Sequence, residues 1–160
     1  MKSLINLIEH KLNKEKIQFS LEIKDILTLK INKENLLKVF KILRYSEELL
    51  FDYLIDITAC DYKEKNIFEV IYHLLSFIRN ERIRIKVELE REKPEIESVC
   101  SIYPGANWFE REVYDLFGIK FLNHPNLKRI LLWESFPGYP LRKDYKLEEE
   151  GPIPTLEDIY

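Results

Sequence analysis

The chain has 160 residues, of which 46% are apolar and 33% are charged, and its formal net charge is −3. This balance is typical of a folded chain, and the length allows one domain with its own core. The acidic charge argues against a nucleic-acid-binding domain that works by bulk positive charge, and no segment has the roughly 18 uninterrupted apolar residues of a membrane span.

The first part of the chain changes from a helical pattern to a strand pattern and back. Residues 2–14 carry leucine and isoleucine at helical spacing, which predicts an amphipathic helix. Residues 17–31 alternate apolar and polar side chains around a connection at Asp25, which predicts a hairpin. Asn32 can cap a second helix, whose apolar face lies within residues 36–43.

Three further strands are predicted over residues 53–61, 67–77 and 82–89. Short polar turns separate them, as in an antiparallel meander. The middle segment is apolar on both faces, which indicates a central position, whereas the last alternates and should show one face to water. Residues 96–103 fit either a short helix or an irregular packing segment, and the pattern does not decide between them.

A helix is then predicted over residues 106–117. Pro104 and Gly105 precede it, and Gly118 follows where a C-cap favours a residue free to take positive φ. One side of this helix is apolar. The other side gathers Trp108, Arg111, Glu112 and Asp115.

The segment after this helix combines prolines with aromatic and basic residues. A strong turn signal covers residues 123–126, and two prolines around Gly138 and Tyr139 forbid regular structure there. An irregular segment must satisfy its backbone polar groups elsewhere. Its aromatic and arginine content is typical of an interface anchor rather than a solvent loop.

Together the elements predict an α+β fold in the order α-β-β-α-β-β-β, with helices on a mainly antiparallel five-stranded sheet. A C-terminal helix and an extended ordered tail complete it. We expect a single α+β domain over residues 1–145 and an extended C-terminal tail over residues 146–160.

Catalytic and cofactor motifs are weak in this sequence. Cys60 and Cys100 have no Cys-x-x-Cys spacing, so we expect free buried thiols rather than a disulfide or a shared metal, and an iron–sulfur cluster typically needs four cysteines. The three histidines show no paired His or Cys spacing for a metal, and the four glycines form no nucleotide-binding motif.

Two of the histidines have expected structural roles. His73 lies within the central strand, where we expect a hydrogen-bonded structural side chain, and His124 precedes a proline in a turn, which it could cap or pin. A stand-alone enzyme that uses Glu110, Glu112 or His124 is the alternative from another class.

Four motifs, in this order and spacing, closely resemble the 30-kDa-type subunit of respiratory complex I, which is the C subunit of bacterial NADH–quinone oxidoreductase. The resembling family has homologues in the photosynthetic NDH complex and in membrane-bound hydrogenases. This sequence departs mildly at Lys128, where arginine is usual, and at Asn126, where an acidic residue is usual. The motifs are residues 107–112 (NWFERE), 115–119 (DLFGI), 124–131 (HPNLKRIL) and 138–145 (GYPLRKDY).

The resemblance implies a non-catalytic structural subunit in the peripheral arm of a proton-translocating NADH–quinone oxidoreductase, bound peripherally at the cytoplasmic side of the cell membrane. It implies partners of the 49 kDa, PSST and ferredoxin-like iron–sulfur types, and no nucleic acid. Iron–sulfur clusters, FMN and quinone are expected in those partners, and none in this chain. The alternative is the equivalent subunit of a nickel–iron hydrogenase or of a ferredoxin- or deazaflavin-linked complex, so the electron donor, quinone and translocated ion stay open.

We predict a partner interface and no catalytic, cofactor or metal site. Within the interface, Glu110 and Arg129 have internal salt bridges as an alternative role. On the interface interpretation, Arg142→Ala should leave the melting temperature of the isolated domain nearly unchanged and lower its recovery in the complex. The predicted interface residues are Trp108, Glu110, Arg111, Glu112, Asp115, Arg129, Arg142, Lys143 and Asp144.

Overall fold

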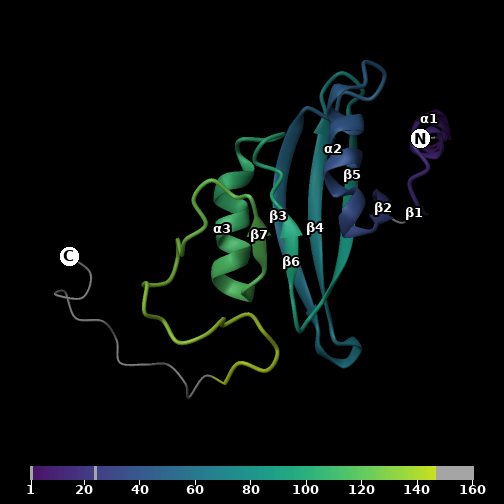
Figure 1. The fold of residues 1–160 in the computed structure, drawn as a ribbon. Helices are drawn as coiled ribbons and strands as arrows, with labels where there is room; N and C mark the ends of the chain where they lie inside the picture. The colour runs from purple at the N-terminus through teal and green to yellow at the C-terminus, as the bar shows by residue number, and fades with distance from the viewer. Residues whose placement is uncertain (1, 24, 147–160) are drawn as a thin grey trace.

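A computed structural model describes residues 2–23 and 25–146 of the chain (Figure 1). It has an α+β fold with one five-stranded sheet and one two-stranded sheet among these residues, which confirms the predicted class. None of the helices described is long and apolar enough to cross a membrane. The predicted tail lies, except for Lys146, outside the described residues.

The helices and strands follow the predicted order, with two short 3₁₀ turns and the three-residue strands β6 and β7 added. The α-helix over 106–117 has the predicted bounds, and the other main elements differ from expectation by a residue or two at their ends. The elements are α1 (Lys2–Lys14), β1 (Phe19–Ile23), β2 (Leu27–Ile31), η1 (Lys33–Asn35), α2 (Leu36–Tyr45), β3 (Tyr53–Tyr62), η2 (Lys63–Lys65), β4 (Ile67–Ser76), β5 (Glu81–Glu90), β6 (Glu95–Glu97), α3 (Ala106–Phe117) and β7 (Lys120–Leu122).

The large sheet has the strand order β1-β2-β5-β4-β3. The pairs β1–β2, β4–β5 and β3–β4 are antiparallel, which confirms the hairpin and the meander. The pair β2–β5 is parallel and joins these two units, with Leu27 opposite Ile83 and Ile31 opposite Val87. The sheet is therefore mixed, because the connection from β2 to β5 crosses over through α2, β3 and β4.

Two local expectations need correction. Asn32 stands before η1 and makes no side-chain capping bond, while Asn35 precedes α2 itself. At the start of the undecided segment 96–103, residues Glu95–Glu97 form β6, which pairs in parallel with β7, the strand that follows α3 in sequence. A strand of three residues is too short for its periodicity to be recognised from sequence.

A single hydrophobic core unites all three helices with the large sheet. Buried side chains of α1, α2 and α3, such as Ile8, Phe40 and Val113, belong to one cluster. In β5 the apolar residues are buried and alternate with charged ones, so one face of the sheet meets the core and the other meets water.

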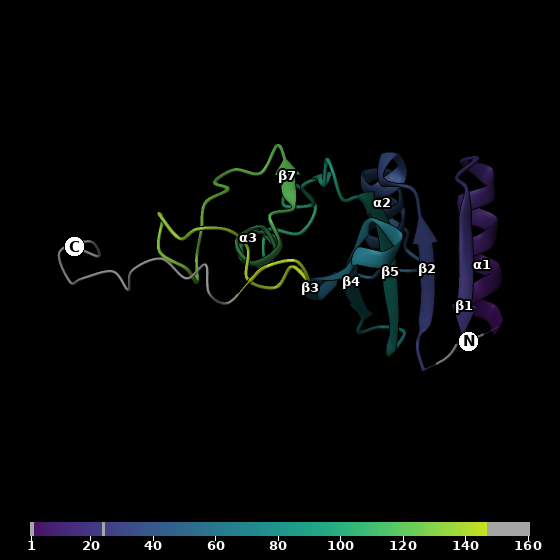
Figure 2. The ribbon, with the colours of Figure 1, turned by 90° about the horizontal axis from the view of Figure 1, so that it is seen from below.

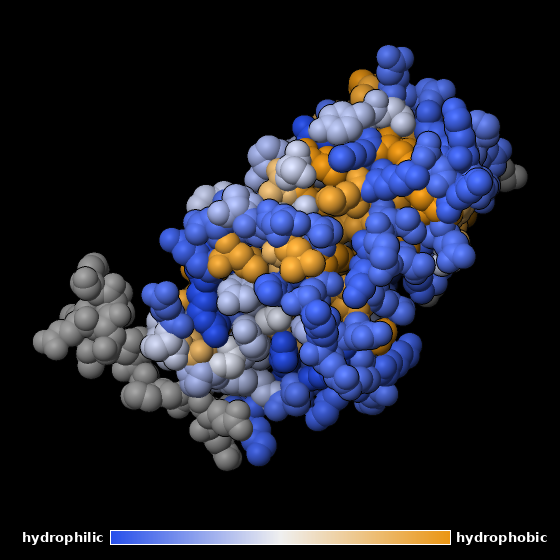
Figure 3. Space-filling view, in the orientation of Figure 1, coloured by the Kyte–Doolittle hydropathy of each residue, from blue (hydrophilic) through white to orange (hydrophobic). Residues whose placement is uncertain are grey.

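The helices lie at separate places along the sheet. Figure 2 shows α1 beside β1 at one end and α3 beside β3 at the other. On the face drawn in Figure 3, apolar side chains show over α3 and α2, framed by hydrophilic ones. The segment after β7 runs over α3 as an irregular loop (Figure 1), and we refer to residues 123–145 as the C-terminal loop.

Candidate functional site

Asp115 binds the backbone of the C-terminal loop. Its side chain is fully buried, and its Oδ2 accepts hydrogen bonds from the N–H groups of Ile130, Leu131 and Leu132 at 2.9, 2.8 and 2.9 Å. Its Oδ1 lies 2.8 Å from a guanidinium nitrogen of Arg129. Burial alone would raise the pKa of Asp115, but the three backbone donors and Arg129 outweigh it, so this pKa is lowered.

Two arginines satisfy the carbonyl groups of the same loop. Arg111 donates to the carbonyl oxygens of Lys128 and Arg129 at 3.1 and 2.9 Å. Arg129 in turn donates to those of Phe136 and Gly138 at 3.0 and 3.1 Å. Arg111 of α3 and Arg129 of the loop itself therefore supply the backbone partners that a proline-containing loop lacks.

Arg142 fastens the end of the loop to the end of α3. Its Nε donates to the carbonyl oxygen of Phe117 at 2.6 Å, and its guanidinium lies between the rings of Phe68 and Tyr139, at 5.2 and 4.7 Å from their centroids. Gly118 has φ +70°, and a Cβ there would lie 2.6 Å from both Arg142 and Tyr139. The helix stop and the close approach of the loop thus both require glycine.

The last part of the loop is tied to the large sheet. Arg91 forms an ion pair with Asp61 of β3 and a second one with Asp144 at 2.6 Å. The backbone N–H of Lys143 donates to Asp61 at 2.8 Å. These bonds give Asp144 and the backbone of Lys143 internal partners, and they leave the Lys143 side chain exposed.

Glu110 lies on another side of α3 and is fully buried. Its carboxyl accepts hydrogen bonds from the hydroxyl of Ser98 at 2.6 Å, the N–H of Val99 at 2.7 Å and the thiol of Cys100 at 3.4 Å. The Nε2 of His124 lies 3.9 Å away. Burial raises the pKa of Glu110 to about 7, although its three hydrogen-bond donors lower it.

The predicted interface residues thus divide into two groups. Six have side chains bound within the chain, namely Glu110, Arg111, Asp115, Arg129, Arg142 and Asp144. The exposed group consists of Trp108, which is 59% exposed and stacks on Arg111, with Glu112 and Lys143. For the bound group, internal bracing is the role that their contacts show, and contact with a partner stays a prediction for all nine residues.

Sequence reasoning missed the apolar residues of this surface. Leu131 and Leu141 are 62% and 48% exposed, in the loop that Asp115 and Arg142 hold in place. The signal was present, because both leucines stand in an irregular segment where no helical or strand period buries them. Exposed apolar side chains on a fixed backbone are the features that mark interaction sites.

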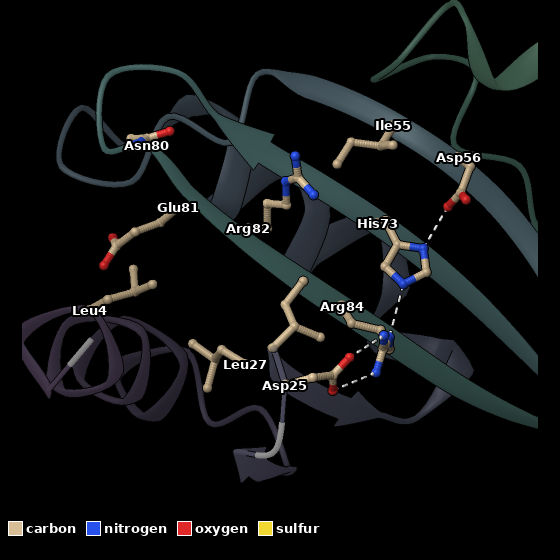
Figure 4. Close-up of a pocket in the computed structure, with 11 residues that line it drawn as sticks. Leu4, Asp25, Leu27, Ile55, Asp56, His73, Asn80, Glu81, Arg82 and Arg84 are labelled. Atoms are coloured by element: carbon tan, nitrogen blue, oxygen red, sulfur yellow. Dashed lines mark hydrogen bonds and ion pairs between the residues drawn. The ribbon is translucent and has the colours of Figure 1, made fainter.

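A large cleft lies away from α3, across four strands of the large sheet (Figure 4). It has a volume of about 560 Å³ and is bordered by Leu4, Ile55, Arg82 and Glu81, among others. His73 within it shares a hydrogen bond with Asp56 at 2.6 Å and accepts one from Arg84 at 2.8 Å. Both ring nitrogens are therefore engaged, which confirms the predicted hydrogen bonding of His73, while its structural role stays a prediction.

Of the residues in the alternative enzyme hypothesis, Glu110 and His124 lie 3.9 Å apart, whereas Glu112 lies on the exposed side of α3. Glu112 is exposed while Glu110 is buried, so these two carboxyl groups do not share a site. The N–H of Asn126 donates to Nδ1 of His124 at 3.0 Å, and Nε2 lies 3.2 Å from the carbonyl oxygen of Asn107. The imidazole is thus neutral, with its proton on Nε2, and it pins the turn.

The fold and this site define an α+β domain whose C-terminal loop is braced by buried charges and presents exposed apolar side chains. The chain belongs to the family described as the 30 Kd subunit of respiratory-chain NADH dehydrogenase, whose model matches residues 29–151. This confirms the resemblance found in the four motifs.

Three curated relatives are each named as the C subunit of NADH-quinone oxidoreductase. The one from Xanthobacter autotrophicus is 49% identical over 121 residues, which are 74% of this chain and 57% of that protein. The one from Citrifermentans bemidjiense is 46% identical over 122 residues, which are 76% of this chain and 74% of that protein. The one from Moorella thermoacetica is 50% identical over 101 residues, which are 63% of this chain and 68% of that protein. The matched part of this chain thus spans little more than half of the Xanthobacter protein.

Two solved structures are similar to this fold. The trypsin-resistant fragment (1–134) of Nqo5 has a TM-score of 0.62 at 26% identity, over 77% of this chain and 98% of the fragment. A chain of the membrane-bound sulfane sulfur reductase, an archaeal respiratory membrane complex, has a TM-score of 0.77 at 23% identity, over 91% and 85%. The second likeness concerns the fold alone.

Proposed function

We propose that this chain is a structural, non-catalytic subunit of an NADH–quinone oxidoreductase. Its family and the name shared by its relatives support this function. Its task in the proposal is to hold other subunits in fixed positions, because electron transfer depends on the distances between centres that those subunits carry.

The observation that carries the proposal is the use of the four motifs. Their charged residues form hydrogen bonds with the protein's own backbone. Asp115 accepts from three N–H groups of the loop, and Arg111, Arg129 and Arg142 donate to carbonyl oxygens of the loop and of α3. The loop is therefore ordered before any partner arrives, which lowers the entropy cost of association. Exposed side chains such as Trp108 are then available for contact.

The proposed partners are subunits of the 49 kDa, PSST and ferredoxin-like iron–sulfur types. In this proposal they carry the iron–sulfur clusters and the quinone pocket, FMN lies elsewhere in the same complex, and this chain adds no cofactor to electron transfer. The chain would reach the cytoplasmic side of the membrane through these subunits, as a peripheral component of the assembly.

Affinity purification from the native cell tests this function. The chain carries a tag at its own locus, and co-purifying subunits are identified by mass spectrometry. A flavin- and NADH-binding subunit together with quinone-site subunits would support the proposal. A nickel–iron subunit would point to the hydrogenase alternative, and a chain that purifies alone and turns over a substrate would refute the structural role.

Two aromatic variants give the experiment a matched control. Trp108 and Phe77 are 59% and 65% exposed, on α3 and on the β4–β5 turn respectively. Trp108→Ala should reduce the yield of the co-purified complex, while Phe77→Ala should leave it near the wild-type level. An equal yield for both variants would contradict the assignment of the contact surface to α3.

A further inference from the structure

Three side chains with different metal-binding atoms meet between α3 and the segments on either side of it. The Sγ of Cys100, a carboxylate oxygen of Glu110 and a ring nitrogen of His124 all lie within 4.8 Å of one another. The Sγ–Oε2 distance is 3.4 Å and the Nε2–Oε2 distance is 3.9 Å. Ligand atoms around a tetrahedral zinc ion lie about 3.3–3.8 Å apart, given bonds of roughly 2.0–2.3 Å. The cluster is thus close to the size of an occupied site.

The cluster has a buried carboxylate without a permanent cation. Glu110 is fully buried, and within the part of the chain that the structure describes neither a lysine nor an arginine pairs with it. Its hydrogen-bond donors are all neutral. An isolated buried carboxylate is unfavourable unless it is protonated or meets a cation.

Among the described residues, two buried polar side-chain atoms of helix α3 and strand β4 lack a hydrogen-bond partner. The hydroxyl of Tyr72 and the Oδ1 of Asn107 are buried without a hydrogen-bond partner. Asn107 is joined to the cluster through the contact of its carbonyl oxygen with His124. Asn107 thus connects the start of α3 to the His124 side of the cluster.

We propose that Cys100, Glu110 and His124 bind a divalent transition-metal ion of the zinc class. One sulfur, one imidazole nitrogen and one carboxylate oxygen suit zinc or cobalt, whereas magnesium and calcium prefer oxygen ligands alone. A thiolate and a carboxylate together balance the two positive charges. Cys100 is half-buried, so water can reach the ion beside it and complete four ligands.

Binding requires defined proton movements. Burial raises the pKa of the Cys100 thiol to about 11, so this thiol is protonated before binding and must release its proton to solvent, because only the thiolate is a good ligand. The Glu110 carboxyl, whose pKa burial raises to about 7, must release its proton to solvent as well wherever it is protonated. His124 must shift its proton from Nε2 to Nδ1, so that Nε2 can face the ion. This shift breaks the hydrogen bond from the N–H of Asn126, and the turn that holds Asn126 must adjust with it.

The ion would link three separate parts of the chain. Cys100 precedes α3, Glu110 lies on it, and His124 stands near the start of the C-terminal loop. Because each ligand comes from a different segment, no short His/Cys spacing in the sequence indicates the site. The ion would join the start of the C-terminal loop to the first half of α3, whereas Arg142 binds the last turn of that helix.

Cobalt titration of the purified chain tests this site, after treatment with EDTA. The wild type should develop a near-ultraviolet thiolate-to-cobalt absorption band that saturates at one ion per chain. Cys100→Ser should lose the band, and Cys60→Ser should keep it, since Cys60 is the other free thiol and lies outside the cluster. Serine keeps a hydroxyl that can donate to Glu110, and circular dichroism checks that the variant is folded.

Zinc provides a second readout that does not depend on sulfur. Zinc should raise the melting temperature of the wild type and of Cys60→Ser, and it should leave that of His124→Ala unchanged. Absence of a saturable cobalt band in the wild type would overturn the proposal. So would a band that survives Cys100→Ser, or an equal effect of zinc on His124→Ala.

Discussion

Asp115 is the residue whose removal should most disturb the C-terminal loop. Asp115→Ala would leave the N–H groups of Ile130, Leu131 and Leu132 without their acceptor and the guanidinium of Arg129 without its carboxylate. The loop has no strand partner among the described residues that could replace these bonds. We therefore expect a large loss of stability from a single truncation.

The magnitude follows from the kind of groups left behind. Breaking a buried ion pair from one side costs about 3–5 kcal/mol, and each hydrogen bond to a charged group contributes about 1.5–3 kcal/mol. These values overlap and are not additive, because the ion pair and the three hydrogen bonds share one carboxylate, so we expect a total of about 4 kcal/mol. For a chain of this size that corresponds to a fall in melting temperature of roughly 10 °C. Asp115→Asn keeps one oxygen acceptor and should cost about half as much.

Thermal and chemical unfolding of the purified chain measure this effect. Glu112→Ala is the matched control, because Glu112 is an exposed carboxylate on the same helix, and its effect should stay within about 0.5 kcal/mol. Trypsin adds a local readout, since Asp115→Ala should speed cleavage after Lys128 and Arg129. If Asp115→Ala melts no lower than Glu112→Ala, the carboxylate does not hold the loop and the reasoning fails.

Three further predictions concern the same region. In EDTA, the free energy of unfolding should fall by up to about 3 kcal/mol as the pH rises from 4.5 to 7, because the pKa of Glu110 is raised from 4.5 to about 7 and unfolding therefore releases a proton in this window. Urea unfolding at the two pH values measures this fall, which Glu110→Gln should reduce. An unchanged pH dependence in Glu110→Gln would contradict the prediction. Gly118→Ala should cost about 1–3 kcal/mol in thermal melts, because of its φ of +70° and the 2.6 Å approach of Arg142 and Tyr139, and a neutral result would show that both neighbours move aside. Arg142→Ala should lower the melting temperature, because Arg142 binds the carbonyl of Phe117, while the exposed Trp108 can be replaced by alanine with little change. This reverses the expectation from sequence that Arg142→Ala leaves the melting temperature nearly unchanged. Equal melting temperatures of the two variants would support that earlier expectation instead.

Local patterns predicted the elements of this fold well where the chemistry is local. The bounds of α3 follow from Pro104 and Gly105 at its start and from Gly118 at its end, which has the positive φ that a C-cap favours. The hairpin of β1 and β2 and the meander of β3, β4 and β5 join neighbours in sequence, so turn signals reveal them.

Long-range pairing was not accessible in the same way. The parallel pairing of β2 with β5 joins strands that are separated in sequence by two other strands and a helix. The hydrophobic periodicity of a strand shows which face is buried, but it does not identify the distant strand with which it pairs. The pairing of β6 with β7 has the same difficulty, and each strand has only three residues.

The candidate site shows a different limit. Sequence reasoning located the charged side of α3, and it recognised that the irregular segment after it needs partners for its backbone. It joined the two observations only as an alternative, in which Glu110 and Arg129 form internal salt bridges, and the ion pair of Arg129 with Asp115 confirms this alternative for Arg129. It assigned Asp115 to a partner, because Asp115 on a helix has the same appearance whether its carboxylate meets another subunit or its own loop. The direction of a side chain depends on tertiary packing, and for Arg111 and Arg142 that packing points inward.

The pairing of β1 with β2 has a consequence for solubility. The family match begins at residue 29, within β2, so α1 and β1 lie outside it. Most of β2 is buried, and removal of the preceding segment would leave this five-residue strand with open hydrogen-bonding groups at the border of the sheet. β1 pairs with β2 along its whole length, so it occupies these groups, and its Glu22 forms an ion pair with Lys30 that places charge at this border and disfavours strand-to-strand aggregation.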